Sequence, residues 1–256
     1  MAMQSDSNAK TSDAAGGTAD PAEIAKFSKL SETWWDPKGK MAPLHKINPL
    51  RLTYIRDAAC RKFERNVKSL NCLSGLRVLD IGCGAGLLCE PFTRLGAQVI
   101  GVDASASNVA VAKLHADKGH LSIDYRCTTV EEMDVRERFD IVLAMEVVEH
   151  VVDVGVFLGR CAAMLKPGGM MVVSTLNRNW KSFALAIVGA EYVLRWLPRG
   201  THQWDKFVTP EELAHHLANN KLGITDQVGV VYNPFADKWN ISTDMSVNYM
   251  VVAEGM

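Results

Sequence analysis

The stretch from residue 78 to residue 86 constrains the fold more than any other part of the chain. Apolar residues there run into glycines at alternating positions, including Gly82 and Gly84, and a helical pattern follows over residues 87–95. This order predicts a buried strand, a tight turn and a helix that begins under the turn. Glycine lets the backbone close on a bound nucleotide, and the helix N-terminus offers N–H groups to polar or anionic ligand atoms.

The spacing of the glycines narrows the class of ligand. A dinucleotide fingerprint, G-x-G-x-x-G/A, would need glycine or alanine where Leu87 stands, which disfavours a nicotinamide dehydrogenase. The chain has G-x-G-x-G instead, and a second predicted strand ends in Asp103. An acid at that place accepts hydrogen bonds from ribose hydroxyls. This combination fits an adenosine-containing ligand without a pyrophosphate and indicates S-adenosylmethionine, bound by Gly82, Gly84 and Asp103.

Strand and helix patterns alternate after the glycine turn. The predicted strands are 97–102, 123–127, 139–144 and 170–175, and the predicted helices are 107–118, 145–150 and 154–165. A C-terminal part adds a helix over 210–219 and strands over 225–232 and 247–253. The alternation predicts an α/β fold with a mostly parallel sheet and helices on both faces. Ligands of such sheets bind at the carboxyl ends of the strands.

Composition favours one large globular domain over residues 21–256. The chain has 256 residues, 48% of them hydrophobic and 22% charged, and its net charge of −1 gives no support for a nucleic-acid partner. Residues 1–20 are rich in Ser, Ala, Asp and Gly, which predicts a disordered tail. The tail is too acidic for a mitochondrial transit peptide. The six cysteines show no C-x-x-C spacing, so we expect reduced thiols in a cytosolic protein.

Acidic and imidazole side chains follow the predicted strand 139–144. Glu146, Glu149 and His150 stand directly after Met145, and in a helix they would share one face. Two carboxylates and an imidazole can hold a divalent cation, with Mg²⁺ or Mn²⁺ favoured by the oxygens and Zn²⁺ permitted by the imidazole. The alternatives are a solvent-facing turn, or His150 acting as a general base without a metal.

Two further segments attract attention. A helix is predicted over 49–70, where Arg51 in the first turn could meet the carboxylate of a bound amino acid. The segment 178–200 is predicted to be an insertion after the strand 170–175. It contains an uncharged apolar run over 183–190 with basic residues on both sides. Such a segment is too short to span a bilayer. It could lie on a membrane surface or form a buried core helix.

Several blocks resemble the ubiquinone biosynthesis O-methyltransferase family. The most specific are Trp34-Trp35-Asp36, Asn48-Pro49-Leu50-Arg51 and Thr175-Leu176-Asn177-Arg178-Asn179, and the similarity extends from residue 22 to the C-terminal strand. One departure is Ala85, where many relatives carry another glycine, a change that the turn should tolerate. The resemblance implies a Rossmann-like class I methyltransferase with a seven-stranded sheet whose last strand is antiparallel.

The resemblance also implies a set of site residues. The S-adenosylmethionine contacts that it implies come from Arg51, Gly82, Asp103 and Met145. The divalent-metal ligands that it implies are Glu146, Glu149 and His150, with magnesium the expected ion. Glu149 and His150 are the catalytic candidates, and the metal requirement and the choice between ligand and general base for His150 stay open.

The implied reaction is the O-methylation of polyprenyl phenol and quinol intermediates at both such steps of ubiquinone biosynthesis. We expect a cytoplasmic protein that associates peripherally with the inner membrane, with other ubiquinone-biosynthesis proteins as candidate partners. One alternative is a methyltransferase acting on a soluble small molecule, which the apolar run over 183–190 disfavours. Another is a non-catalytic subunit of a quinone-synthesis complex, which the intact Glu146, Glu149 and His150 disfavour.

Overall fold

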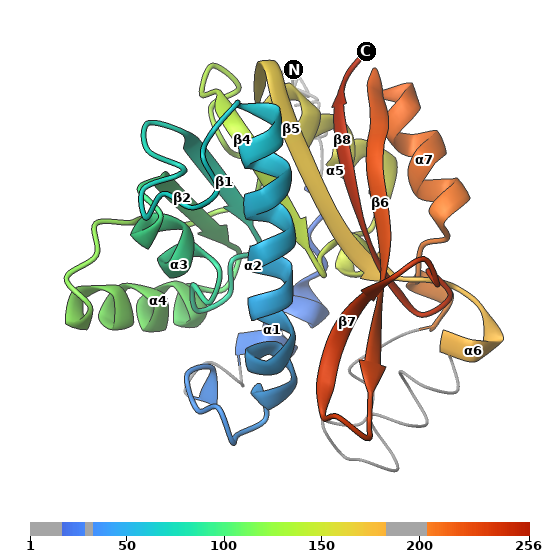
Figure 1. Cartoon of the computed structure of the whole chain (residues 1–256), viewed down its shortest axis with the longest axis horizontal. Coiled ribbons are helices and arrows are strands. Elements are labelled where there is room, and N and C mark those ends of the chain that lie inside the picture. The colour runs from blue at the N-terminus through green and yellow to red at the C-terminus, as the bar shows by residue number, and fades with distance from the viewer. Residues whose placement is uncertain (1–16, 29–32, 183–203) are drawn as a thin grey trace, which may run out of the picture.

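The computed structural model describes residues 17–28, 33–182 and 204–256. An eight-stranded sheet crosses the described part of the molecule in the order β3-β2-β1-β4-β5-β8-β6-β7 (Figure 1). The strands are β1 Arg77–Ile81, β2 Gln98–Asp103, β3 Asp124–Cys127, β4 Phe139–Met145, β5 Leu165–Leu176, β6 Leu222–Asn233, β7 Lys238–Ser242 and β8 Asn248–Gly255.

The first five strands run parallel, as the alternating pattern predicts. Strand β8 is antiparallel to both β5 and β6, and β7 is antiparallel to β6. The predicted α/β class and the antiparallel last strand are confirmed, whereas the predicted count of seven strands is wrong. The additional strand is β7, whose five residues form a hairpin with the end of β6.

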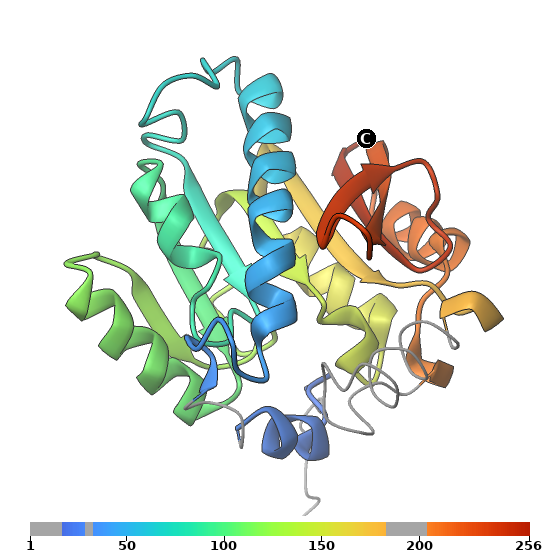
Figure 2. The same ribbon diagram turned by 60° about the horizontal axis from the view of Figure 1, so that its bottom comes forward.

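The described helices are α1 Pro21–Ser28, α2 Ala42–Lys62, α3 Cys89–Arg94, α4 Ala106–Lys118, α5 Val154–Ala163, α6 Trp180–Ser182 and α7 Pro210–Asn219, with 3₁₀ turns η2 Val148–His150 and η4 Trp204–Lys206. Figure 2 shows α2, α3 and α4 on one side of the sheet, with α5 and α7 on the other. None of the described helices is both long enough and apolar enough to cross a lipid bilayer.

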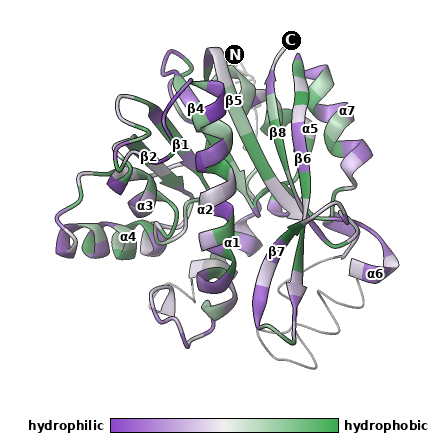
Figure 3. Cartoon of the chain, in the orientation of Figure 1, coloured by the Kyte–Doolittle hydropathy of each residue, from purple (hydrophilic) through white to green (hydrophobic). Residues whose placement is uncertain are grey.

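Each face of the sheet has its own core. Along β4, Ile141 and Leu143 belong to the core under α2, α3 and α4, whereas Val142 and Ala144 belong to the core under α5 and α7. Alternate side chains of a strand point to opposite faces, so a strand covered on both faces is apolar throughout. Figure 3 accordingly shows the central strands mainly in the hydrophobic colour, whereas α4 and α7 carry both colours.

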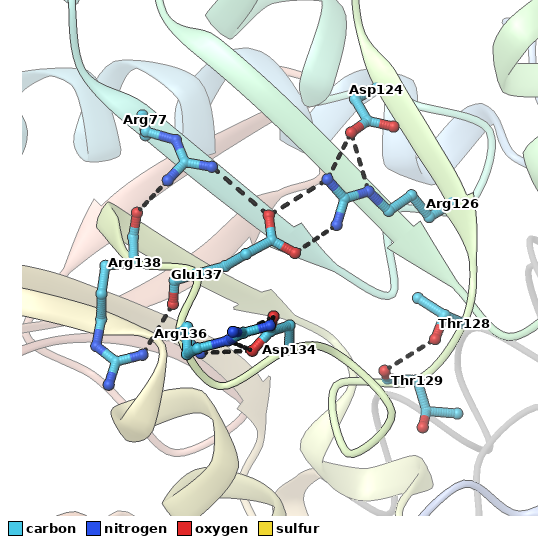
Figure 4. Close-up of polar contacts among 9 residues, drawn as sticks. All are labelled: Arg77, Asp124, Arg126, Thr128, Thr129, Asp134, Arg136, Glu137 and Arg138. Atoms are coloured by element: carbon cyan, nitrogen blue, oxygen red, sulfur yellow. Dashed lines mark hydrogen bonds and ion pairs between the residues drawn. The ribbon is translucent and has the colours of Figure 1, made fainter.

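An ion-pair network lies at the amino ends of the strands. Glu137, just before β4, contacts Arg126 of β3 at 2.7 Å and Arg77 of β1 at 3.6 Å, and Arg126 also binds Asp124 (Figure 4). These carboxylates raise the pKa of Arg126. Partly exposed pairs of this kind contribute little each. The network joins β1, β3 and β4 at their amino ends. The carboxyl ends, where the glycine turn lies, stay open for ligands.

Three predicted boundaries differ from the structure. The helix predicted over 49–70 is α2 and runs from Ala42 to Lys62, so Arg51 lies in its interior. Strand β5 runs from Leu165 to Leu176, whereas the predicted strand began at residue 170. Residue Ala19, inside the predicted tail 1–20, pairs with Val151, so the packed chain begins before α1.

Candidate functional site

A cavity of about 610 Å³ opens at the carboxyl ends of the central strands. Its size lies within the usual range of small-molecule sites, about 300–1,000 Å³. The predicted site residues that line it are Arg51, Gly82, Asp103, Met145, Glu146, Glu149 and His150. Residues far apart in the sequence meet here because the carboxyl ends of parallel strands share one edge. Figure 2 shows α1 beneath this edge.

The glycine turn has the left-handed backbone that its sequence predicts. Gly82 and Gly84 have φ of 68° and 54°, values that few other residues adopt without strain. A Cβ at Gly84 would lie 2.5 Å from Cη2 of Trp34, and a Cβ at Gly82 would lie 2.5 Å from Cγ2 of Val147. The neighbouring Trp35 donates from Nε1 to the carbonyl of Ala85 at 3.1 Å. Both tryptophans therefore cover the turn.

Asp103 is joined directly to the glycine turn. Its Oδ2 accepts a hydrogen bond from the Gly84 N–H at 2.9 Å, and its Oδ1 accepts from the Ser105 N–H at 2.8 Å. Burial raises the pKa of Asp103. Oδ1 also accepts from the Asn108 amide at 3.2 Å. Oδ2 can therefore accept the second hydrogen bond, which places it for a ribose hydroxyl. Gly84 contributes here through its N–H rather than as part of the cavity wall.

Asp80 lies at the bottom of the cavity, within β1. Only 3% of the residue is exposed, and its Oδ2 accepts from the Cys89 thiol with 3.1 Å between the heavy atoms. Burial raises the pKa of Asp80 to about 7, and the nearby charge of Asp103 adds to the increase. A carboxyl group of such pKa is sensitive to the charge of whatever occupies the cavity.

Arg51 and Glu146 form an ion pair inside the site. Arg51 is 3% exposed, and its Nη2 donates to Oε1 of Glu146. The same oxygen accepts from the Ser174 hydroxyl at 2.6 Å and from the Asn248 amide at 3.0 Å. These donors hold Glu146 at a φ of 58°, which is unusual for a residue with a side chain. The prediction that Arg51 lies in the first turn of its helix is wrong, because α2 begins at Ala42.

Glu149 is a buried acid of the cavity wall, 3% exposed. Its Oε2 accepts a hydrogen bond from the Thr175 hydroxyl at 2.8 Å. Among the described residues, Oε1 is buried without a hydrogen-bond partner. Burial, and next the charge of Glu146, raise the pKa of Glu149 well above its usual range. A cationic or proton-donating group at Oε1 would relieve both effects.

His150 faces an acid from the amino-terminal part of the chain. Its Nδ1 lies 2.9 Å from Oε2 of Glu23, and the two side chains are 16% and 8% exposed. Glu23 belongs to α1, which packs over the site because Ala19 pairs with Val151 and the Ser28 hydroxyl lies 2.7 Å from that of Ser105. The sequence did not predict the contact between Glu23 and His150, because an acid in a short amphipathic helix does not indicate contact with a distant histidine.

The predicted helical face of Glu146, Glu149 and His150 does not form. Glu146 has a left-handed backbone, and a three-residue 3₁₀ turn follows it, from Val148 to His150. Glu146 turns to Arg51 and His150 turns to Glu23. Within residues 17–28, 33–182 and 204–256, no three His, Cys, Asp or Glu side chains are gathered in a way that could hold a metal ion.

The predicted membrane-facing segment is described only at its borders. Its apolar run over 183–190, together with Arg195 and Arg199, lies outside the described residues. At the borders, Arg178 pairs with Glu212, Lys181 with Asp244 at 2.7 Å and Lys206 with Asp20 at 3.0 Å. These three basic side chains are thus engaged within the protein.

Known proteins identify the family. A family described as a methyltransferase domain matches residues 52–226. The ubiquinone biosynthesis O-methyltransferase of Bradyrhizobium sp. (strain ORS 278) is 82% identical over 256 residues, which is 100% of both chains. The enzyme of the same name from Bradyrhizobium diazoefficiens is 84% identical over 241 residues, or 94% of this chain and 95% of the relative. The chain belongs to the ubiquinone biosynthesis O-methyltransferase family.

Solved structures agree on the fold of this methyltransferase. The magnesium protoporphyrin IX methyltransferase from Synechocystis PCC 6803 with bound SAH has a TM-score of 0.63 at 16% identity, covering 91% of this chain and 95% of the other. A 1,6-didemethyltoxoflavin-N1-methyltransferase from Burkholderia thailandensis has a TM-score of 0.58 at 19% identity, with coverage of 95% and 93%. The enzyme is an S-adenosylmethionine-dependent O-methyltransferase of the class I fold.

Proposed function

We propose that the enzyme O-methylates polyprenyl-substituted catechol and hydroquinol intermediates at both such steps of ubiquinone biosynthesis. The observation that carries the proposal is that Glu149 and His150 line the same cavity as Gly82 and Asp103. A methyl donor held by the glycine turn would therefore meet its acceptor beside an acid and an imidazole. The names of relatives that are 82% and 84% identical support the choice of acceptor.

Binding of the donor falls to the edge of β1 and β2. The glycine turn and the carboxylate of Asp103 would take the nucleoside, with hydrogen bonds from the ribose hydroxyls to Asp103. Met145 lies on the cavity wall, 8% exposed, where its thioether can pack against the apolar part of the donor. Arg51 reaches the cavity but already binds Glu146, so we assign it to holding Glu146 in place.

Transfer requires a deprotonated acceptor, because an ordinary phenol has a pKa of about 10. We assign proton acceptance to Nε2 of His150, since Nδ1 faces Glu23 at 2.9 Å. The carboxylate of Glu23 would then orient the imidazole and stabilise the imidazolium that forms. Positive donor and negative acceptor neutralise each other during transfer. An apolar cavity with the two atoms in near-attack geometry therefore favours the reaction.

A divalent cation fits the site through two carboxylates. Oε1 of Glu149 is buried without a partner among the described residues, and Glu146 raises the pKa of Glu149 by its charge. Mg²⁺ binds through one or two carboxylates and completes its shell with water or substrate oxygens, so a three-residue cage is not required. We propose Glu146 and Glu149 as the residues that hold it. When bound, the cation would favour the ionised form of the acceptor oxygen.

The proposed location is the cytoplasmic side of the inner membrane, with the chain attached peripherally. An apolar run over 183–190 inside the insertion 178–200 supports this, because the polyprenyl chain of the acceptor stays in lipid. Arg178 and Lys181 pair within the protein, and we propose Arg195 and Arg199 of the sequence as the basic residues for anionic headgroups. We place the body of the enzyme in one domain, 21–256, and other ubiquinone-biosynthesis proteins remain candidate partners.

The test is a methyl-transfer assay with labelled S-adenosylmethionine and a short-chain catechol, with and without a chelator. We expect label on a phenolic oxygen. Label on carbon or nitrogen, or bound donor without any transfer to the catechol, would contradict the proposed acceptor.

A further inference from the structure

The additional strand forms a wall beside α2. Only the first part of β6 pairs with β8, and beyond Val230 the strand continues as a hairpin with β7 (Figure 1). Asp237 at the hairpin turn binds Lys46 of α2 at 2.7 Å and the hydroxyl of Tyr232. The hairpin is thereby held against the amino-terminal half of α2.

The space between the hairpin and α2 belongs to the same cavity as the cofactor residues. From the hairpin it is lined by Val230, Val231, Tyr232, Pro234 and Trp239, and from the first turns of α2 by Pro43, Leu44, Ile47 and Asn48. None of these lining residues is charged. The rings of Tyr232 and Trp239 lie against each other, with centroids 5.3 Å apart. Most charged residues of the cavity stand elsewhere on its wall, among them Asp103 and Glu149, whereas Lys181 and Asp244 line it as an ion pair at 2.7 Å close to Gly229 of β6.

The outer end of this space combines exposed apolar side chains with the ion pair of Lys46 and Asp237. Phe235, in the hairpin turn, is 100% exposed and Val231 is 38% exposed. An apolar passage thus leads from the reacting groups to the surface between α2 and the hairpin.

We propose that this passage, bounded by Leu44 and Ile47 on α2 and by Val231, Tyr232 and Trp239 on the hairpin, binds the first isoprene units of the acceptor. The inference rests on the proposed function, because that function supplies an acceptor whose reacting ring carries an aliphatic chain. A chain leaving a ring at Glu149 and His150 needs an apolar route out of the cavity. The route toward Asp103 serves the donor.

Two exposed hairpin residues give a matched pair of variants. Val231 lines the passage, whereas Ile241, 43% exposed on β7, is not among the lining residues. The substrates are a catechol without a chain and the same catechol carrying two isoprene units. We expect Val231→Asp to raise KM for the chain-bearing catechol about tenfold or more, as a lost apolar contact does. It should leave kcat and KM for the chainless catechol within about twofold of wild type, and Ile241→Asp should leave both substrates unchanged.

Equal losses on both substrates, or equal effects of the two variants, would overturn the proposal. Calorimetric binding of the chain-bearing catechol separates this outcome from failure of the proposed function. A wild-type enzyme that binds the ligand more tightly than the Val231→Asp variant, without transferring methyl, retains the passage and loses the proposed function. A wild-type enzyme that binds both catechols equally has no chain site here.

Discussion

Nδ1 of His150 lies 2.9 Å from Oε2 of Glu23, which joins the amino-terminal helix α1 to the turn after β4. An imidazole held in this way has a fixed orientation and a defined proton position. The pair places an acid from α1 in the machinery proposed for the acceptor, in the same cavity as the residues proposed to bind the donor.

Glu23→Gln should lower kcat about tenfold to hundredfold, because the imidazolium loses its carboxylate partner. Glu23→Asp should restore part of the rate. The measurement is steady-state kinetics beside calorimetric donor binding and a melting curve. A merely structural role predicts a lower Tm, weaker donor binding and no rescue by aspartate. Glu211→Gln, at an exposed position of α7, is the control.

Asp103→Asn should weaken S-adenosylmethionine binding about tenfold or more, since hydrogen bonds to a charged acceptor are the strong ones. Titration calorimetry measures the Kd directly. Asp124→Asn is the matched control, because Asp124 starts the neighbouring strand and binds Arg126 away from the cavity. Unchanged affinity of the Asp103 variant would remove this carboxylate from the donor site.

The raised pKa of Asp80 predicts that the stability of the protein depends on pH. This pKa rises from 3.8 to about 7 on folding, chiefly through burial. Between these values the unfolded chain releases a proton that the folded protein keeps, so stability falls as the pH rises and levels off above about pH 7. The loss amounts to about 4 kcal/mol at most. Urea unfolding from pH 5 to pH 8 should show the gain in stability of Asp80→Asn over wild type growing toward pH 7. Parallel curves for the two proteins would contradict the shift.

Glu149→Gln should reduce the affinity for Mn²⁺, used as a probe, about tenfold or more while keeping the shape of the side chain. Without metal the variant should be no less stable than wild type, because it removes the repulsion from Glu146. Paramagnetic resonance measures the bound ion. Glu90→Gln is the control, because the Glu90 side chain is likewise buried, 4% exposed, and is not among the residues that line the cavity. Equal Mn²⁺ affinity in all three proteins would end the cation proposal.

Charge reversal of both Arg195 and Arg199 should lower binding to anionic liposomes about tenfold or more, since each basic residue near such a surface contributes about 1 kcal/mol. Flotation with vesicles containing phosphatidylserine measures the bound fraction. The double variant Arg136→Glu and Arg160→Glu, at two exposed positions, changes the net charge by the same amount and is the control. Equal flotation of the double variant and wild type would leave the segment without a membrane role.

Local sequence signals determined the parallel strands and placed Gly82 and Asp103 at the end of the sheet where the cavity opens. The strand, glycine turn and helix over residues 78–95 could be predicted because their pattern depends on neighbours within a few positions. Asp103 could be predicted because it ends a strand, and the carboxyl ends of parallel strands share an edge whatever the rest of the chain does. The family blocks likewise indicated the chemistry.

Tertiary structure alone decided where β7, Arg51, Glu146 and Glu23 lie around the part of the cavity that we propose for the acceptor. Strand β7 alternates polar and apolar residues over only five positions, which is too short a pattern to separate a strand from a turn, and it forms because β6 offers it a partner. Arg51 is buried because Glu146 and Ser174 accept from it, and Glu146 abandons a helical backbone to remain in that pair. Glu23 meets His150 because α1 folds over the sheet edge. Each is a contact between distant segments, and a buried charge takes the place where its partner lies, which no local pattern encodes.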